Sequence, residues 1–115
     1  KVSIVDYVPL DMAYEKSDLV IHHGGHGSCL AQFYYGVPSV IIPTHTEREY
    51  NARMCEKLHV GKMLPRRELN SANLKNCINH VLNDITYKKS VRDWKEKVSG
   101  DFNNLDKVVK LVDSL

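Results

Sequence analysis

A short apolar segment that runs directly into a cluster of glycines constrains the fold of this chain more than any other feature. Residues 18–22 (DLVIH) are almost continuously apolar, as expected of a strand that is buried on both faces. Gly24, Gly25 and Gly27 follow within four positions, and a helix is predicted over about residues 28–35. A buried strand, a glycine turn and a helix in this order predict one unit of an α/β fold with a parallel sheet.

The alternation of short apolar runs and helical patterns continues along the chain. Further strands are predicted at residues 1–5, 39–42 and 62–64, and further helices at residues 10–16, 47–58, 71–83, 87–99 and 105–115. Helical spacing predicts three buried faces: Tyr50, Met54 and Leu58; Leu74, Ile78, Val81 and Leu82; Val91, Trp94 and Val98. The pattern predicts a single α/β, Rossmann-like three-layer domain, with an α/β part at about 1–64 and a helical tail at about 65–115.

Composition limits the classes of function. A net charge of +2 over 115 residues does not favour nucleic acid as a partner. Three widely spaced cysteines without a CxxC pattern indicate neither a zinc site nor a disulfide framework, and they favour a reducing, cytoplasmic compartment. The apolar runs are far shorter than the ~20 residues of a membrane-spanning helix, and a peripheral membrane contact is allowed but not indicated. Because the first residue is Lys1, we expect a domain truncated at its N-terminus.

The glycine segment has the properties of an anion site. Glycine permits positive φ angles and close approach of the backbone to a ligand. A helix N-terminus carries unpaired N–H groups and a partial positive charge, and this combination binds phosphate. The segment also follows the carboxyl end of a strand, where open α/β sheets bind ligands. The hydroxyl of Ser28 is expected to cap the helix or to contact phosphate, and His23 and His26 carry ring N–H donors.

Glycine spacing alone leaves two alternatives open. The segment is neither a Walker motif nor GxGxxG, so a turn that binds nothing is equally compatible with it. A zinc site built from His22, His23 and His26, with His45 in reserve, is disfavoured. The first two lie on adjacent strand positions and therefore point in opposite directions, and no carboxylate or cysteine nearby completes the set of ligands.

Further motifs surround this segment in a fixed order. They are DYVPL at 6–10, HHGGHGS at 22–28, GVP at 36–38, Pro43, and Asn51-Ala52. Together they resemble the C-terminal domain of family-1 glycosyltransferases, within the bacterial macrolide and antibiotic group that uses UDP- or dTDP-activated sugars. The match runs from about Val5 to Leu64. The resemblance implies the C-terminal, nucleotide-sugar-binding half of a GT-B glycosyltransferase, a hexosyltransferase that uses no metal and no cofactor.

The resemblance also implies roles for individual residues. His23 corresponds to the histidine that donates to the donor diphosphate, the glycine segment supplies backbone and hydroxyl donors, and Tyr7 and Val8 border the nucleobase. Glu47 and Arg48 fall where the family usually has the Asp-Gln pair that contacts sugar hydroxyls. The implied donor site comprises Tyr7, Val8, His23, Gly24, Gly25, His26, Gly27, Ser28, Gln32, Glu47 and Arg48. No catalytic base belongs to this chain, because the family places it in an N-terminal acceptor domain. The fragment alone is therefore expected to bind donor without transferring its sugar.

Three positions depart from the family pattern. Ala31 stands where a glutamate usually holds the ribose hydroxyls, and the adjacent Gln32 is a candidate substitute. Glu47-Arg48 replaces Asp-Gln, and the added charge fits an acidic sugar, a further phosphate contact or plain surface. Leu10 replaces a frequent glutamine.

Three other functions stay open, and Ala31 and Arg48 bear on the second of them. One is a donor-binding subunit of a two-protein glycosyltransferase, with the acceptor half on a partner chain. Another is a nucleotide-sugar-binding module without catalysis. A GT-B epimerase fits the glycines but not the flanking motifs. A reading frame of roughly 250 further residues upstream, enough for a second domain, would exclude the two-protein arrangement.

Overall fold

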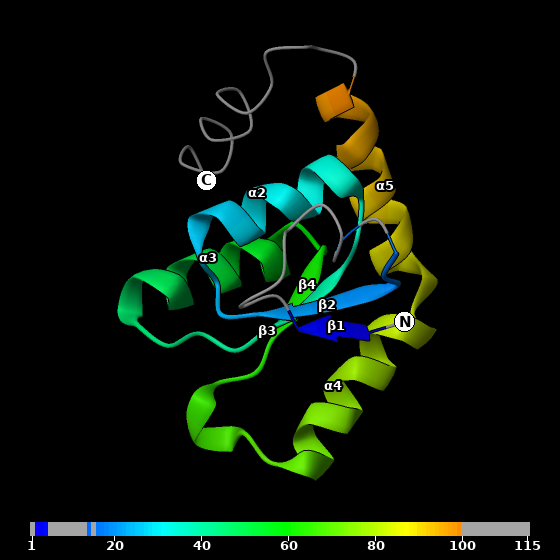
Figure 1. The fold of residues 1–115 in the computed structure, drawn as a ribbon. Coiled ribbons are helices and arrows are strands. Elements are labelled where there is room, and N and C mark those ends of the chain that lie inside the picture. Colours follow the sequence, from blue (N-terminus) through cyan, green and yellow to red (C-terminus); the bar gives the residue numbers. More distant parts are fainter. Residues whose placement is uncertain (1, 5–13, 15, 100–115) are drawn as a thin grey trace.

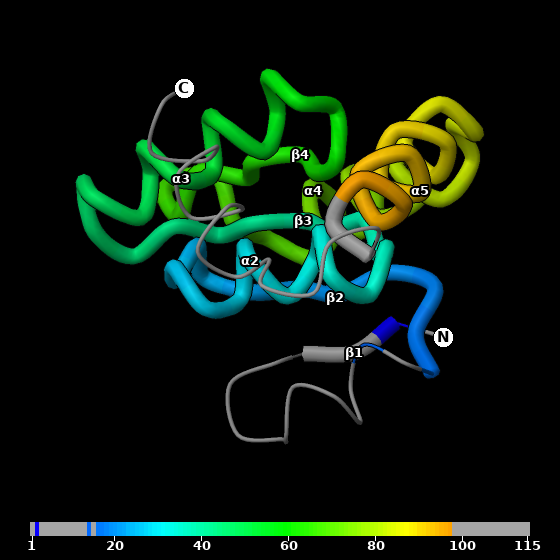
Figure 2. The backbone as a smooth tube through the Cα atoms, turned by 90° about the horizontal axis from the view of Figure 1, so that it is seen from above, coloured from blue at the N-terminus to red at the C-terminus, as the bar shows by residue number. Residues whose placement is uncertain are grey.

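A four-stranded parallel sheet forms the centre of the molecule. The computed structural model describes residues 2–4, 14 and 16–99 (Figure 1). Strands β1 (Val2–Ile4), β2 (Leu19–His22), β3 (Ser39–Ile41) and β4 (Gly61–Met63) lie side by side in chain order, and each neighbouring pair is parallel (Figure 2). The predicted parallel sheet is confirmed. The helices predicted at 10–16 and 105–115 fall on residues 10–13, 15 and 105–115, which lie outside the described part.

In the part of the chain that the structure describes, four α-helices and one short 3-10 helix connect and follow the strands. They are α2 (His26–Tyr35), α3 (Thr46–Lys57), η1 (Arg66–Glu68), α4 (Ser71–Asn83) and α5 (Ile85–Ser99). Helix α2 begins two residues earlier than predicted, with Gly25 at its N-cap and no side-chain cap bond. Ser28 therefore lies inside the first turn, and the prediction that its hydroxyl caps the helix is wrong.

The sheet is covered on both faces. Helices α2 and α3 lie on one face and α4 lies on the other (Figure 1). Successive residues of a strand point to opposite faces, so Ile41 packs with α2 and α3, whereas Val40 packs with α4. Helix α5 packs against α2, where the Trp94 ring meets the Phe33 ring edge-on at 5.2 Å. The predicted three-layer arrangement is confirmed.

Two predicted core positions are exposed instead. Leu82 is 43% exposed, because the buried face of α4 runs through Leu74, Cys77, Ile78 and Val81, and Leu82 lies one position beyond it. Tyr50 is 53% exposed, because the buried face of α3 is centred on Asn51 and Cys55. In both helices the spacing identified the helix and most of its buried face, and only the residue at the margin of each predicted face is exposed.

The carboxyl ends of the parallel strands share one edge of the sheet. Strand β2 leads there into the glycine segment and α2, and β3 leads into residues 42–45 and α3. Two helix N-termini therefore lie at the same edge, one strand apart. Within the residues that the structure describes, no helix is both long and apolar enough to cross a membrane.

Candidate functional site

The glycine loop, residues 22–25, makes a tight turn against the first turn of α3. Gly24 is buried and has a φ of 85°, a backbone region that favours glycine. A Cβ at this position would lie 2.7 Å from the carbonyl oxygen of Arg48. The loop and α3 can approach this closely only because residue 24 has no side chain.

His22 belongs to the core rather than to the site surface. Its ring is 1% exposed. Its Nδ1 accepts a hydrogen bond from the Gly24 N–H at 3.0 Å, so the ring proton sits on Nε2, which donates to Gln32 Oε1 at 2.9 Å. Both ring nitrogens are therefore used inside the domain.

His23, the next residue, turns the other way and is half-buried. Its Nδ1 lies 3.0 Å from the carbonyl oxygen of Ile42, at the end of β3. A carbonyl oxygen only accepts, so Nδ1 carries the proton of this hydrogen bond. The bond fixes the orientation of the ring beside the glycine loop, and Nε2 becomes a donor as well when the ring is an imidazolium.

The N-terminus of α2 differs from those of the other described α-helices. Its first helical hydrogen bond runs from the Cys29 N–H to the Gly25 carbonyl at 3.0 Å, which leaves the N–H groups of residues 26–28 without a carbonyl partner within the helix. Neither an acidic residue in the first turn nor a side-chain cap compensates this end. Glu47 and Glu49 occupy the first turn of α3, and Asn70 and Asp84 bond to the first turns of α4 and α5.

Arg48 adds a cation to the same end of α2. A Cβ on Gly25 would lie 3.9 Å from the guanidinium carbon of Arg48, and the arginine side chain is half-buried. Glu47, one residue earlier, is exposed. The structure thus brings Arg48 to the glycine loop, where the guanidinium adds to the positive potential of the helix end.

Gln32 does not lie at the site surface. Its side chain is 0% exposed, and its Nε2 donates to the carbonyl oxygens of Val60 at 3.0 Å and Val37 at 3.4 Å. With its Oε1 bound to His22, the whole amide is used in the core. The expectation that Gln32 substitutes for a ribose-binding glutamate is therefore wrong. Tyr7 and Val8, the expected nucleobase contacts, lie outside the described residues.

Asn51 is a buried polar residue to which the sequence reading assigned no role. It is 9% exposed, and its Nδ2 donates to the Gly24 carbonyl at 2.9 Å. The sequence motif could have pointed to this role, because Asn51-Ala52 is part of the family pattern. An amide side chain in that pattern, on a helix beside the loop, indicates a hydrogen bond to the loop backbone.

The cysteines and histidines do not assemble a metal site. Within residues 2–4, 14 and 16–99, no cluster of three or more histidine, cysteine or acidic side chains could hold an ion. All three cysteines are buried and free. The neighbouring Cys29 thiol and burial together raise the pKa of Cys55 well above its ordinary value, and burial raises the pKa of Cys77. Their position indicates packing residues.

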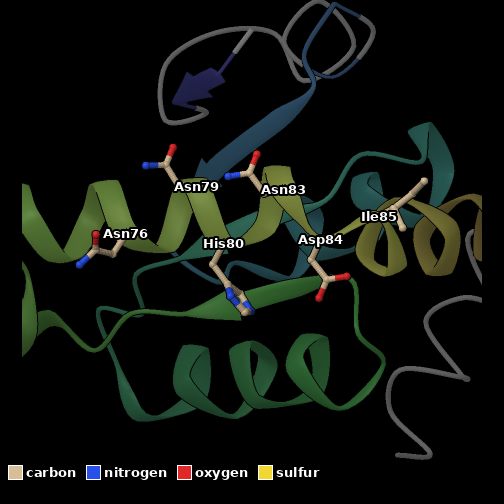
Figure 3. A pocket seen from close by; sticks show the side chains of 6 residues that line it. All are labelled: Asn76, Asn79, His80, Asn83, Asp84 and Ile85. Atoms are coloured by element: carbon tan, nitrogen blue, oxygen red, sulfur yellow. The ribbon is translucent and has the colours of Figure 1, made fainter.

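Two surface hollows lie outside the glycine loop. The first, of about 500 Å³, lies along α4 and the start of α5. Its side chains do not converge, because Asn79 and Asn83 point to one side of α4 while His80 and Asp84 point to the other (Figure 3). The second, of about 490 Å³, lies between residues 43–46 and 65–67, at the same sheet edge as the glycine loop. Only the second adjoins the candidate site.

Comparison with known proteins identifies the family. The family model described as "Erythromycin biosynthesis protein CIII-like, C-terminal domain" matches residues 1–113. The chain belongs to this family. Its glycine loop, β2, β3 and both flanking helices all fall within the matched region.

Relatives of this C-terminal domain are named as glycosyltransferases. The putative UDP-glucuronosyltransferase ugt-50 of Caenorhabditis elegans is 32% identical over 115 residues, which is 97% of this chain and 22% of that protein. Uncharacterized UDP-glucosyltransferase YdhE of Bacillus subtilis is 28% identical over 97% of this chain and 28% of that protein. The chain thus spans less than a third of the length of either relative.

Solved structures share the fold. The glycosyltransferase VinC, solved in complex with dTDP, superposes with a TM-score of 0.75 at 20% identity, over 94% of this chain and 27% of that chain. At this identity the likeness establishes the Rossmann-like C-terminal domain of a GT-B enzyme as the fold.

Proposed function

We propose that the full-length protein is a glycosyltransferase and that this chain binds its donor, a UDP- or dTDP-linked hexose. The diphosphate lies at the N-terminus of α2, where the N–H groups of residues 26–28, the Ser28 hydroxyl and His23 donate to it. Arg48 supplies a charged contact. Glu47 contacts sugar hydroxyls, and Tyr7 and Val8 border the base. The nucleotide sugar is a substrate, and the site uses no cofactor.

One observation carries this proposal. Among the described α-helices, α2 alone begins without an acidic residue or a side-chain cap, and a guanidinium lies against its N-cap glycine. The partial positive charge of the helix end and the full charge of the guanidinium converge on one exposed backbone end, and an anion with several acceptor oxygens stabilises both. A diphosphate has this chemistry. The family supports the same assignment, as do relatives that are named for UDP-sugars.

The chemistry of the step follows from where charge develops. Transfer breaks the bond between the anomeric carbon and the β-phosphate oxygen, and the electron pair stays on the nucleoside diphosphate. Donors that are already oriented toward that oxygen stabilise the transition state more than the ground state. The acceptor hydroxyl oxygen forms the new bond to the anomeric carbon and loses its proton to a base in an acceptor domain, in the same chain or in a partner subunit. We place the reaction in the cytoplasm on the basis of the free cysteines.

The test is nucleotide binding by the full-length protein. Titration calorimetry with UDP and dTDP is expected to show binding by the wild type. His23→Ala and Ser28→Ala are each expected to weaken it about tenfold, the size of one charge-assisted hydrogen bond. His80→Ala, which changes an exposed histidine on α4, is the matched control and should bind as the wild type does.

Two outcomes would contradict the proposal. Absence of binding by the wild type would remove the donor site altogether. Unchanged binding by both loop variants would remove the assignment to α2. Product formation with a panel of UDP- and dTDP-sugars then separates a transferase from a binding module that lacks catalysis.

A further inference from the structure

The Gly24 peptide is held on both sides by buried side chains. Its N–H donates to His22 Nδ1 at 3.0 Å, and its carbonyl accepts from Asn51 Nδ2 at 2.9 Å. His22 comes from β2 and Asn51 from α3, two elements that flank the loop. Both side chains are at least nine-tenths buried, so water does not compete for these hydrogen bonds.

The His22 ring is itself held from behind. Its Nε2 donates to Gln32 on α2, and Gln32 donates onward to the Val60 carbonyl, just before β4. The direction of each hydrogen bond in this series is set, because the Gly24 N–H donates at one end and the Val60 carbonyl accepts at the other. The orientation of the loop is thereby tied to β2, α2 and the turn after α3.

We propose that Asn51 and His22 are positioning residues for donor binding: they hold the Gly24 peptide so that the following N–H groups present a preformed anion site. They bond to the Gly24 peptide and make no contact with the nucleotide sugar. The inference rests on the proposed function and deepens it, because it explains how a loop with a positive φ at Gly24 is ordered before the nucleotide arrives. Preorganisation of this kind raises affinity by reducing the ordering cost of binding.

A pair of substitutions at residue 22 separates the two contacts of the ring. The side-chain amide of asparagine occupies the place of Nδ1, and that of glutamine occupies the place of Nε2. His22→Asn therefore keeps an acceptor for the Gly24 N–H, whereas His22→Gln keeps only the contact to Gln32. We expect His22→Gln to weaken UDP or dTDP binding by the full-length protein about tenfold more than His22→Asn does.

Asn51→Ala tests the other side of the peptide. It leaves the buried Gly24 carbonyl without a donor, and we expect about tenfold weaker UDP or dTDP binding. Val81→Ala is the stability control, since it removes core volume on the opposite face of the sheet and touches no loop residue. Val81→Ala should lower the melting temperature without weakening binding.

Hydrogen exchange of the Gly24 amide supplies a readout that needs no ligand. His22→Gln should accelerate this exchange at least tenfold relative to the wild type and to His22→Asn, and Asn51→Ala should accelerate it as well. Exchange unchanged in both His22→Gln and Asn51→Ala overturns the positioning role, whether or not nucleotide binds. If the wild type binds no nucleotide while the exchange responds as expected, the donor site and the role of His22 and Asn51 in donor binding are both overturned. The two residues then only order the loop.

Discussion

Helices α2 and α3 begin at the same edge of the sheet, after neighbouring parallel strands, and their first turns are chemically opposite. The first turn of α3 contains Glu47 and Glu49, whose charges offset the positive end of that helix. The first turn of α2 contains no acidic residue. Arg48 of α3 lies against the N-cap of α2. One helix end is neutralised by its own sequence, and the other has neither an acidic residue nor a side-chain cap.

The difference shows why a helix N-terminus and a strand end are insufficient to define a binding site. Both helices have those features, yet only α2 combines a glycine at its N-cap with a turn free of carboxylates. The two ends therefore serve as controls for each other, because a change that makes α2 resemble α3 should remove the site.

The largest effect is expected when an acidic residue enters the first turn of α2. Gly27→Asp introduces a carboxylate where a Cβ meets no atom within 4 Å, so the fold accommodates it. The carboxylate stabilises the helix end by about 0.3–1 kcal/mol, so the melting temperature should rise. It also opposes the diphosphate, so UDP and dTDP binding should weaken at least about 100-fold.

Calorimetry and thermal unfolding of the same Gly27→Asp preparation check both parts. Gly27→Ala controls for the loss of glycine and should raise helix stability without the charge effect. Retained nucleotide affinity in Gly27→Asp would show that the anion does not bind at this turn.

A smaller effect is expected when the cation is removed. Arg48→Gln restores the uncharged residue type of the wider family, and we expect UDP binding to weaken about five- to tenfold, with a smaller dependence on salt. Arg53→Gln is the matched control, because this arginine lies on the same helix, is 68% exposed and pairs with Glu49 at 2.8 Å. Equal UDP affinities for Arg48→Gln and the wild type would show that Arg48 takes no part in nucleotide binding.

The smallest effect concerns α5, whose N-terminus is compensated by Asp84. The Thr86 hydroxyl and N–H bond to this carboxylate and lower its pKa below the ordinary 3.8. A lowered folded-state pKa means that the ionised group stabilises the fold above about pH 4 and loses this contribution as the pH falls through the folded-state value. Asp84→Ala should therefore lower the melting temperature at pH 7 and flatten its decline below pH 4.

Nucleotide affinity should stay unchanged in Asp84→Ala, since α5 begins at a different place in the fold. If acid lowers the melting temperature of the Asp84→Ala variant as steeply as that of the wild type, groups other than Asp84 cause the acid sensitivity.

The two adjacent histidines illustrate how far sequence reasoning reached. A strand period of two predicts that His22 and His23 point in opposite directions, and they do. Which of the two faces the core depends on the partners that reach them, Gln32 for the first and Ile42 for the second. Those partners lie 10 and 19 residues away along the chain, so no local pattern identifies them.

The sequence by itself determined the alternation of strands and helices, the glycine loop at a strand end, and the family. These are properties of local periodicity and of motif order, which are written along the chain. Tertiary structure alone decided that Gln32 belongs to the core, that Asn51 holds Gly24, and that Arg48 lies at the N-terminus of α2. The last two depend on α3 packing against the loop after β2, a contact between residues more than 20 positions apart, and the first depends on His22 and the Val60 carbonyl reaching the Gln32 amide. Only the folded sheet brings these residues together.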